Sequence, residues 1–432
     1  MISFNSMKRI FISYLRKILN LLIEFPSDIY KNICRSTFLP LCKYKIAQQQ
    51  RNNCAIKVGF FVISNATEIF WEPLYDLFSK DNRFDPYMVI VPYTYASEEY
   101  KISTVSNLKE LIVKSGRKVV VADEPNIRES VCCRHFFAYG LVFHMDPYTW
   151  LCNPETQMRN LTRSLIFYTP YSYCIVNKDN AFELKSLKHP YKILPETRLH
   201  INCHQKYGIT KGKNVSPFLG YMGVHKLLNT TKCQYNWRLK KSNVKKVIIA
   251  PHHVLGLGNI LRLSQFYLHL ARHYENRISF VFKPHPYLKE DLKKYWSETD
   301  IKNYYSQWDK MPNTQLEEGE YINLLKTSDA MILDSGAFNA EYSLLYKPLF
   351  FVEKKPRRKF NEVGEKIFNV QYHGHSENEI IDFIENVVLN ENDILYTARK
   401  TFIDTYFWPP NIDIARNTYE YVLSTIKYST KY

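Results

Sequence analysis

A lysine and a histidine follow a short apolar run in the second half of the chain, in the sequence Phe280-Val-Phe-Lys-Pro-His-Pro286. Such a run is typical of a buried parallel strand. The two prolines fix the backbone around His285 and remove amide donors, so we expect the imidazole to point at a ligand from the strand end. The alternative is a turn in which His285 bonds a backbone carbonyl. Lys283 supplies a point charge suited to a pyrophosphate, and a solvated edge position would suit it equally.

A second apolar run, at 330–333, ends in Asp334, Ser335 and Gly336, and a helix is predicted over 338–345. A hydroxyl, a glycine and the free amides of a helix N-terminus can together cradle a phosphate. Asp334 could instead cap the helix. Ligands of open α/β sheets lie outside the carboxyl ends of the strands. Because both runs end in anion-binding groups, the pair indicates a ligand that carries phosphate.

Two adjacent histidines, His252 and His253, follow a third apolar run at 247–250. One of them can meet a phosphate while the other packs. Adjacent side chains point in different directions, and the nine cysteines include no Cys-x-x-Cys pair. We therefore predict no metal site and no cofactor.

The elements that would position these residues alternate between strand and helix. A chain of 432 residues is too long for one ordinary core. We predict a basic N-terminal extension at 1–54, an acceptor-side domain at 55–239, a donor-binding domain at 240–389 and a helical tail at 390–432 that crosses back. The predicted strands are 56–63, 87–91, 118–122, 141–144, 173–176, 215–219, 247–250, 278–282, 330–333 and 349–352. The predicted helices are 71–80, 263–273, 321–326, 338–345, 377–389 and 412–423.

These segments carry a family resemblance. Lys283-Pro-His-Pro286, followed by Ser328-Asp-Ala-Met-Ile-Leu-Asp-Ser-Gly336 and Lys347-Pro-Leu-Phe-Phe351, resembles the CDP-glycerol glycerophosphotransferase family. The likeness extends over about residues 55 to 390 and is stronger after Lys245. It implies a GT-B-like α/β fold, in which two Rossmann-like domains with parallel sheets face a cleft. It also implies transfer of a glycerol-phosphate or related polyol-phosphate unit from a CDP-activated donor to a bacterial teichoic-acid-like or capsular polymer.

The resemblance assigns roles to single residues. His285 would contact the donor phosphates and assist departure of the nucleotide, with His252, His253, Lys283, Asp334 and Ser335 near the same phosphates. In nucleotide-sugar transferases of this architecture, a carboxylate at the position of Glu341 receives ribose hydroxyls, whereas an ordinary helix glutamate is the competing interpretation. The common family pattern Asp-Tyr-Ser-Ser is altered here, since Gly336 and Ala337 replace both serines. One hydroxyl to phosphate is therefore missing.

The catalytic base also departs from the family pattern. The family uses the histidine of a Trp-His-Gly motif, whereas the corresponding stretch 167–173 contains no histidine. His144 and Asp146, at the end of the predicted strand 141–144, are the substitute candidates for catalysis. The alternative is a turn in which Asp146 caps and Tyr148 packs.

The net charge of +16 favours an anionic partner. Up to Lys57, ten basic residues face two acidic ones. The stretch 10–25 is predicted to be an amphipathic helix that lies on anionic lipid at the inner face of the plasma membrane, or packs on the protein itself. The odd number of cysteines fits reduced cytoplasmic thiols. Arg357, Arg358 and Lys359 could hold an anionic polymer or lipid-linked acceptor, or form a solvated loop.

Two other functions remain open. One is a GT-B glycosyltransferase that uses a nucleotide sugar in capsule or lipopolysaccharide synthesis, and the other is a non-catalytic scaffold in polymer assembly. A nucleic-acid partner is not predicted, because the basic residues gather at the N-terminus and in loops rather than alternating with aromatic residues on one surface.

Overall fold

The computed structural model describes residues 38–63, 65–92, 98–123, 127, 130–148, 153–176, 181–241, 243–256, 258–319, 321–354 and 359–426. For residues 65–69, 98, 100 and 337 the backbone alone is described. The predicted amphipathic helix 10–25 lies outside the described residues, as do Arg357 and Arg358 of the predicted anion patch. Residues 38–51 are helical.

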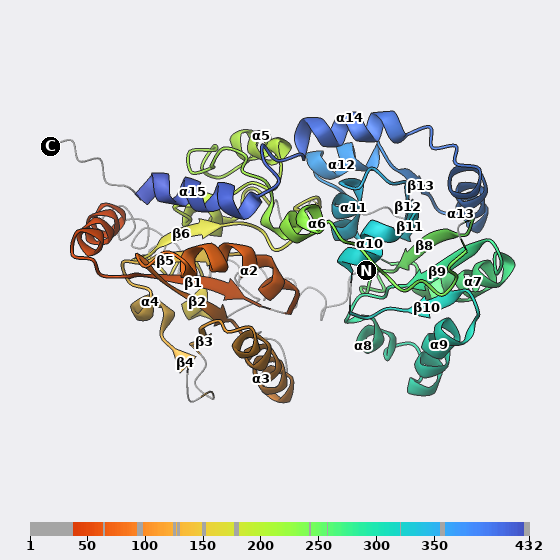
Figure 1. Ribbon diagram of the computed structural model, residues 1–432, viewed down its shortest axis with the longest axis horizontal. Coiled ribbons are helices and arrows are strands. Elements are labelled where there is room, and N and C mark those ends of the chain that lie inside the picture. The colour runs from red at the N-terminus through yellow and green to blue at the C-terminus, as the bar shows by residue number, and fades with distance from the viewer. Residues whose placement is uncertain are drawn as a thin grey trace, which may run out of the picture. The chain divides into compact units, whose positions relative to one another are not determined.

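The chain divides into two compact units (Figure 1). The first comprises Met1–Thr169, Lys185–Ile193 and Thr418–Tyr432, and the second comprises Pro170–Leu184 and Leu194–Asn417. These units are defined by contacts and not by continuous segments, so the predicted domain boundaries stay predictions.

The first unit contains a parallel sheet of seven strands in the order β4-β3-β2-β1-β5-β6-β7. Its strands are β1 (Ile56–Val62), β2 (Phe84–Ile90), β3 (Val119–Ala122), β4 (Ser130–Val131), β5 (Leu141–His144), β6 (Leu165–Tyr168) and β7 (Lys192–Ile193). Its helices are α2 (Asn65–Ser79), α3 (Glu98–Lys114) and α4 (Cys133–Phe136). The end of α15 (Ile414–Ile426) also belongs to this unit, where the ring of Tyr419 lies edge-on against Phe78, with 5.0 Å between centroids.

The second unit contains a parallel sheet of six strands in the order β10-β9-β8-β11-β12-β13 (Figure 1). Its strands are β8 (Lys245–Ala250), β9 (Ile278–Phe282), β10 (Thr314–Leu316), β11 (Ala330–Leu333), β12 (Leu349–Val352) and β13 (Tyr372–Gly374). Its helices are α5 (Arg198–Lys206), α6 (His225–Asn229), α7 (Ile260–His273), α8 (Leu288–Leu292), α9 (Glu298–Lys310), α10 (Ile322–Thr327), α11 (Gly336–Ser343), α12 (Glu362–Phe368), α13 (Glu377–Asp382) and α14 (Tyr396–Tyr406). A π-helical segment, Phe383–Leu389, continues α13.

The predicted two-unit α/β fold with parallel sheets is therefore confirmed. The strands read as continuous apolar runs because helices cover both faces of each sheet. In β9, for example, all five residues are buried. Alternate residues of one strand then pack into different cores.

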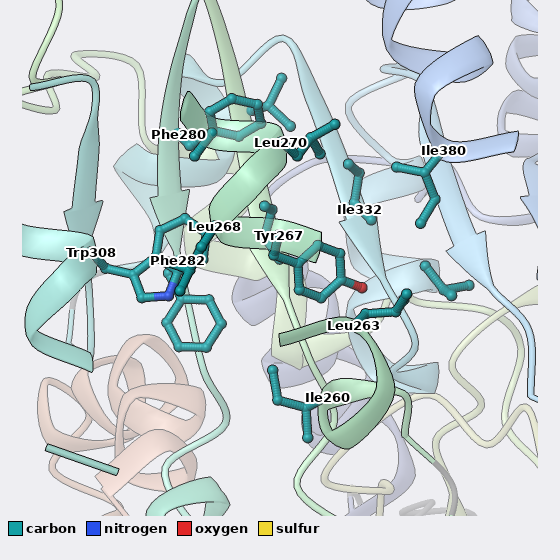
Figure 2. Close-up of a cluster of buried hydrophobic side chains, with 14 of the residues drawn as sticks. Ile260, Leu263, Tyr267, Leu268, Leu270, Phe280, Phe282, Trp308, Ile332 and Ile380 are labelled. Carbon is teal, nitrogen blue, oxygen red and sulfur yellow. The ribbon is translucent and has the colours of Figure 1, made fainter. Parts of the chain in front are cut away.

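The core on one face of the second sheet joins the strands to α7 and α9. Phe282 at the end of β9 stacks on Trp308 of α9, with ring centroids 4.8 Å apart and planes 9° apart. Figure 2 shows these two rings together with Leu268 of α7. Neither Phe282 nor Trp308 is exposed at all. This packing fixes the end of β9, from which Lys283 and His285 continue.

The sequence analysis missed α9, although its signals are present. Ser297 caps the helix by accepting a hydrogen bond from the amide of Asp300 at 3.1 Å. Its buried residues recur at helical spacing, but three of the four are tyrosine or tryptophan, and polar and charged residues separate them. The buried residues are Ile301, Tyr304, Tyr305 and Trp308.

Two predicted strands are wrong. Residues 215–219 form no strand beyond a single bridge residue at Val215, and Pro217 could not donate to a neighbouring strand. Residues 173–176 form no strand: Val176 makes an isolated antiparallel bridge with Phe360, and side chains bond the backbone of Cys174. The amide of Cys174 donates to Glu196 at 3.0 Å, and its carbonyl accepts from Asn361 Nδ2 at 2.7 Å.

No helix among the described residues is long and apolar enough to cross a membrane. The predicted association with a membrane surface depends on residues outside that part of the chain and stays a prediction.

Removing the Phe282 ring should destabilise the second unit. Phe282→Ala deletes a fully buried ring, and large-to-small changes of this kind cost about 3–5 kcal/mol. Urea denaturation followed by circular dichroism would measure the loss. Tyr295→Ala is the matched control, because Tyr295 is 66% exposed and its removal should change the free energy of unfolding by less than about 0.5 kcal/mol. Equal stability of both variants would contradict the assigned packing.

Candidate active site

The candidate residues lie at the point where the strand order of the second sheet reverses. Counted along the chain, the strands stand in the order 3-2-1-4-5-6, so the reversal falls between β8 and β11. Ala250 and Leu333, the last residues of these strands, are paired in register. Ligands of doubly wound sheets bind outside the carboxyl ends of the strands at such a switch point. The residues that follow β8, β9 and β11 therefore occupy the position expected of a ligand site.

The Asp334 carboxylate joins the segments after β8 and β11. It accepts hydrogen bonds from the amide of His252 at 2.6 Å, from the amide of Asn259 at 2.5 Å and from Asn259 Nδ2 at 3.4 Å. Asn259 Nδ2 also donates to the carbonyl of Val352 at 3.0 Å. Asp334 is 7% exposed, and burial raises its pKa to about 6 in spite of these donors. Its oxygens hold the loop 251–259, so the contacts fit neither the predicted phosphate contact nor the helix cap; the N-cap residue is Ser335.

Lys354, two residues after the end of β12, also bonds the segment after β8. Lys354 Nζ donates to the carbonyls of Leu255 at 2.8 Å and Gly258 at 3.2 Å. The sequence analysis missed this role because ninety-six residues separate Lys354 from Gly258.

Three imidazole rings stack at the ends of β8 and β9. The ring centroids of His252 and His253 lie 4.9 Å apart, and those of His253 and His285 lie 4.1 Å apart. The Tyr287 ring continues the group at 5.8 Å from His285. Burial, together with the neighbouring His253 and Lys283, lowers the pKa of His285 to about 4, although Asp291 acts in the opposite direction. His285 is therefore a neutral imidazole at pH 7.

Backbone amides determine the tautomers of two of these rings. His285 Nδ1 accepts from the amide of Tyr287 at 3.2 Å, and His252 Nδ1 accepts from the amide of Val254 at 2.9 Å. An amide N–H can only donate, so Nδ1 carries no proton in either neutral ring and Nε2 carries it. His285 thus presents an N–H donor, for which the described residues supply no acceptor. Such a donor suits a phosphate oxygen.

His253 differs because its partner is a carboxylate. Its Nδ1 lies 2.8 Å from Asp291 Oδ2, and Asp291 also bonds Lys294 Nζ at 2.6 Å. Burial alone would raise the pKa of Asp291, but the bonds from Lys294 and His253 hold it below its ordinary value. The sequence analysis missed Asp291, which lies thirty-eight residues from His253 in a stretch without a motif.

The remaining candidates for phosphate contact are Lys283, which follows β9, and Ser335 and Gly336, at the start of α11. Lys283 is 7% exposed, and its Nζ donates to the carbonyl of Gly319 at 3.3 Å. Ser335 is the N-cap residue of α11, but its side chain makes no capping bond, so its hydroxyl can face a ligand. Gly336 is closely approached by an apolar side chain, since a Cβ there would lie 3.3 Å from Cδ1 of Ile175.

Glu341 lies on α11 in partly buried surroundings with Tyr173 and Tyr221 nearby. Burial raises the pKa of its carboxyl to about 8. Among the described residues its side chain has no hydrogen-bond partner. It is therefore not an ordinary solvated helix glutamate, and its carboxyl oxygens can accept hydrogen bonds from the hydroxyl groups of a ligand.

His144 and Asp146 lie at the end of β5 in the first unit and have the contacts of the alternative turn. His144 Nε2 bonds the carbonyl of Thr156 at 3.0 Å, and its Nδ1 accepts from the amide of Asp146 at 3.2 Å. Asp146 Oδ1 accepts from the amide of Tyr148 at 2.8 Å. Burial lowers the pKa of His144 to about 4. Because both ring nitrogens are engaged, a role as base would require this turn to open.

Two predictions have little structural context. Lys359 is exposed, but the other residues of the predicted acceptor patch lie outside the described ranges. Within those ranges, no group of three or more His, Cys, Asp or Glu side chains is arranged to hold a metal ion.

Neither a protein-family model nor a curated protein matches the sequence. Solved structures are similar in fold. A UDP-N-acetylglucosamine 2-epimerase from Listeria monocytogenes has a TM-score of 0.57 and 13% identity, over 86% of this chain and 96% of that one. The UDP-GlcNAc 2-epimerase from Neisseria meningitidis bound to UDP-GlcNAc has a TM-score of 0.54 and 15% identity, over 85% and 100%.

The wall teichoic acid polymerase TagF, as a histidine variant soaked with CDPG, has a TM-score of 0.54 and 12% identity, over 96% of this chain and 97% of that one. Identities this low show the fold alone. The predicted GT-B-like architecture is confirmed, and membership of the glycerophosphotransferase family stays a prediction.

Replacing Asp334 should release the loop that carries His252. Asp334→Ala leaves the buried amide of Asn259 and the partly buried amide of His252 without an acceptor, which should lower the free energy of unfolding by about 2–4 kcal/mol. Hydrogen exchange of the amides of His252 and Asn259 should accelerate. Asp382→Ala on the exposed side of α13 should change neither quantity. Unchanged exchange in the Asp334 variant would refute the assigned role.

Glu341→Gln should make stability less dependent on pH. The ordinary pKa of 4.5 is raised to about 8 in the folded protein, so the protonated carboxyl is favoured by folding. This contribution is complete below pH 4.5 and is lost as pH rises to about 8. The variant should therefore gain stability relative to the wild type over that range, by on the order of 2–4 kcal/mol. Denaturation at several pH values would measure the trend, which Glu298→Gln, at a side chain 84% exposed, should not show.

Proposed function

We propose that this protein is a GT-B transferase that moves a glycerol-phosphate or related polyol-phosphate unit from a CDP-activated donor to a cell-surface polymer or its lipid-linked precursor. The acceptor hydroxyl would attack the phosphorus that bears the polyol, and CMP would leave. The acceptor, the membrane surface and the cytoplasmic location belong to this proposal.

The observation that carries the proposal is the His285 ring at the switch point of the second sheet, whose Nδ1 accepts a backbone amide proton and whose Nε2–H has no acceptor among the described residues. Phosphoryl transfer is catalysed mainly by positioning and by neutralising charge on the phosphates. His285 Nε2–H, the Lys283 ammonium and the uncapped start of α11 at Ser335 follow strands that are neighbours or next neighbours in the sheet. A diphosphate placed outside the ends of β9, β8 and β11 would meet all three groups.

Glu341 supports a nucleotide as the group that carries the diphosphate. Its carboxyl lies on α11, the helix whose first residues would receive phosphate, and no described residue bonds it. A ribose diol would provide the donors that a buried carboxyl otherwise lacks.

A nucleotide sugar is the second candidate donor. Gly336 and Ala337 lack the serine hydroxyls of the glycerophosphotransferase pattern. Among the similar structures, the Neisseria epimerase is bound to UDP-GlcNAc and TagF is soaked with CDPG. The same phosphate site would then serve transfer of a sugar, with UDP as the leaving group.

The test is nucleotide release by the purified full-length protein. We would supply CDP-glycerol, CDP-ribitol and UDP-sugars with bacterial membrane extract and measure CMP and UDP. Release of CMP is expected, and His285→Ala should lower the rate by about 10²–10³-fold because one donor to developing charge is lost. His269→Ala, at an exposed position on α7, is the matched control and should retain wild-type activity.

The outcomes separate the candidates. UDP release that depends on His285 would establish the glycosyltransferase instead. Release of neither nucleotide from any donor would contradict both enzymes and favour the scaffold function.

A further inference from the structure

The three stacked histidines differ in what each can do with a proton. This inference rests on the proposed function, because it assigns the proton acceptor of the same reaction. The residues considered are the stacked His252, His253 and His285, and the charged groups around them are Lys283, Asp291, Lys294 and Asp334.

His252 and His285 cannot accept a proton from a substrate while their turns are intact. In each ring the only nitrogen with a lone pair is Nδ1, and that lone pair receives a backbone amide proton, from Val254 in one case and from Tyr287 in the other. Protonating Nδ1 would set two N–H groups against each other. Both rings are therefore restricted to donating through Nε2.

His253 has the opposite arrangement. Its Nδ1 faces the Asp291 carboxylate at 2.8 Å, so Nδ1 carries the proton and the lone pair lies on Nε2. The described residues supply no hydrogen-bond partner for that nitrogen. The side chains of His253 and Asp291 are 26% and 23% exposed, so the ring is within reach of a ligand.

The carboxylate also suits the protonated state of His253. The ring centroids of His253 and His285 lie only 4.1 Å apart, so two positive charges on these rings would repel each other. The ammonium of Lys283 adds to this repulsion at His285. Asp291 compensates for one such charge and is itself held ionised by Lys294. The stack can therefore hold one added proton, and His253 is the ring with a counter-ion for it.

We propose that His253 is the general base of the transfer reaction and that Asp291 is its positioning residue. His253 Nε2 takes the proton of the acceptor hydroxyl as the new bond from that oxygen to phosphorus forms. The bond from phosphorus to the oxygen of the departing CMP breaks, and its electron pair leaves with CMP. His253 then returns the proton to solvent, so the reaction is balanced without a further reactant.

The protonation assignment can be tested without substrate. Histidine labelled with ¹⁵N and ¹³Cε1 would be followed by NMR from pH 5 to 9, with His253→Gln, His252→Gln and His285→Gln used to assign the signals. The ring of His253 should carry its proton on Nδ1, with Nε2 as the free nitrogen. His252 and His285 should show the opposite, Nε2–H tautomer. An Nε2–H tautomer in the His253 ring, or an Nδ1–H tautomer in the His285 ring, would overturn the proposal.

Kinetics test the catalytic part. Asp291→Asn retains the shape of the partner but can donate to Nδ1, which favours the wrong tautomer, and kcat should fall by about 10²–10⁴-fold. KM for the donor should remain within about threefold of wild type because phosphate contacts are kept. His253→Gln should lower kcat at least as much, and the double variant no further, since the two residues act as a unit. Glu290→Gln, at a 67% exposed side chain next to Asp291, is the matched control.

The results distinguish this inference from the proposed function. If Asp291→Asn releases nucleotide at the wild-type rate, or if the kcat losses of the two single variants add in the double variant, the assigned roles of His253 and Asp291 are overturned. The proposed transferase activity would be unaffected. Absence of release from every donor would overturn the transferase and, with it, the role of His253 as base. The NMR spectra would still decide which ring holds the proton.

Discussion

The candidate site depends on the buried Asp334 carboxylate and the N–H groups directed at it. Burying a carboxylate is costly unless donors replace water, and the amides of His252 and Asn259 provide them. Because these donors belong to the segment after β8 whereas Asp334 follows β11, the interaction fixes two strand ends against each other. The histidines then start from a defined backbone. Without an acceptor at this position, the segment after β8 would be held by Lys354, by the bond from Asn259 Nδ2 to the Val352 carbonyl and by the contact of His253 with Asp291.

The three stacked histidines have the same side chain but differ in the hydrogen-bond partner of Nδ1. Two rings receive an amide proton on Nδ1 and become donors, and one faces a carboxylate and keeps a free lone pair. The proline on each side of His285 sets the turn that brings the Tyr287 amide to its ring. The differences are thus produced by the neighbours of each ring and not by its residue type, which explains why the sequence alone left the three histidines with interchangeable roles.

The sequence predicted what local pattern determines. The apolar runs at 278–282, 330–333 and 349–352 match β9, β11 and β12 residue for residue, because strands buried on both faces have few polar interruptions. Because these runs were predicted to be strands, His252, His285 and Ser335 were expected at the carboxyl edge of the second sheet, where they lie after β8, β9 and β11. Contacts between distant residues were not predictable: Asp334 with the segment after β8, Asp291 with His253, and the side chains of Glu196 and Asn361 with the backbone of Cys174. No periodicity in a single chain encodes these pairs.

Gly336 lies against an apolar side chain, that of Ile175. A Cβ at this position would lie 3.3 Å from Ile175, and Gly364 approaches the carbonyl of the same residue so closely that a Cβ would lie 2.2 Å away. Ile175 is 2% exposed and is held between the starts of α11 and α12. A side chain at 336 would therefore require the end of the Ile175 side chain to move by a few tenths of an ångström. An apolar side chain thus covers the start of α11 at Gly336, and Ser335 and the backbone amides are the groups through which the proposed phosphate contact would be made.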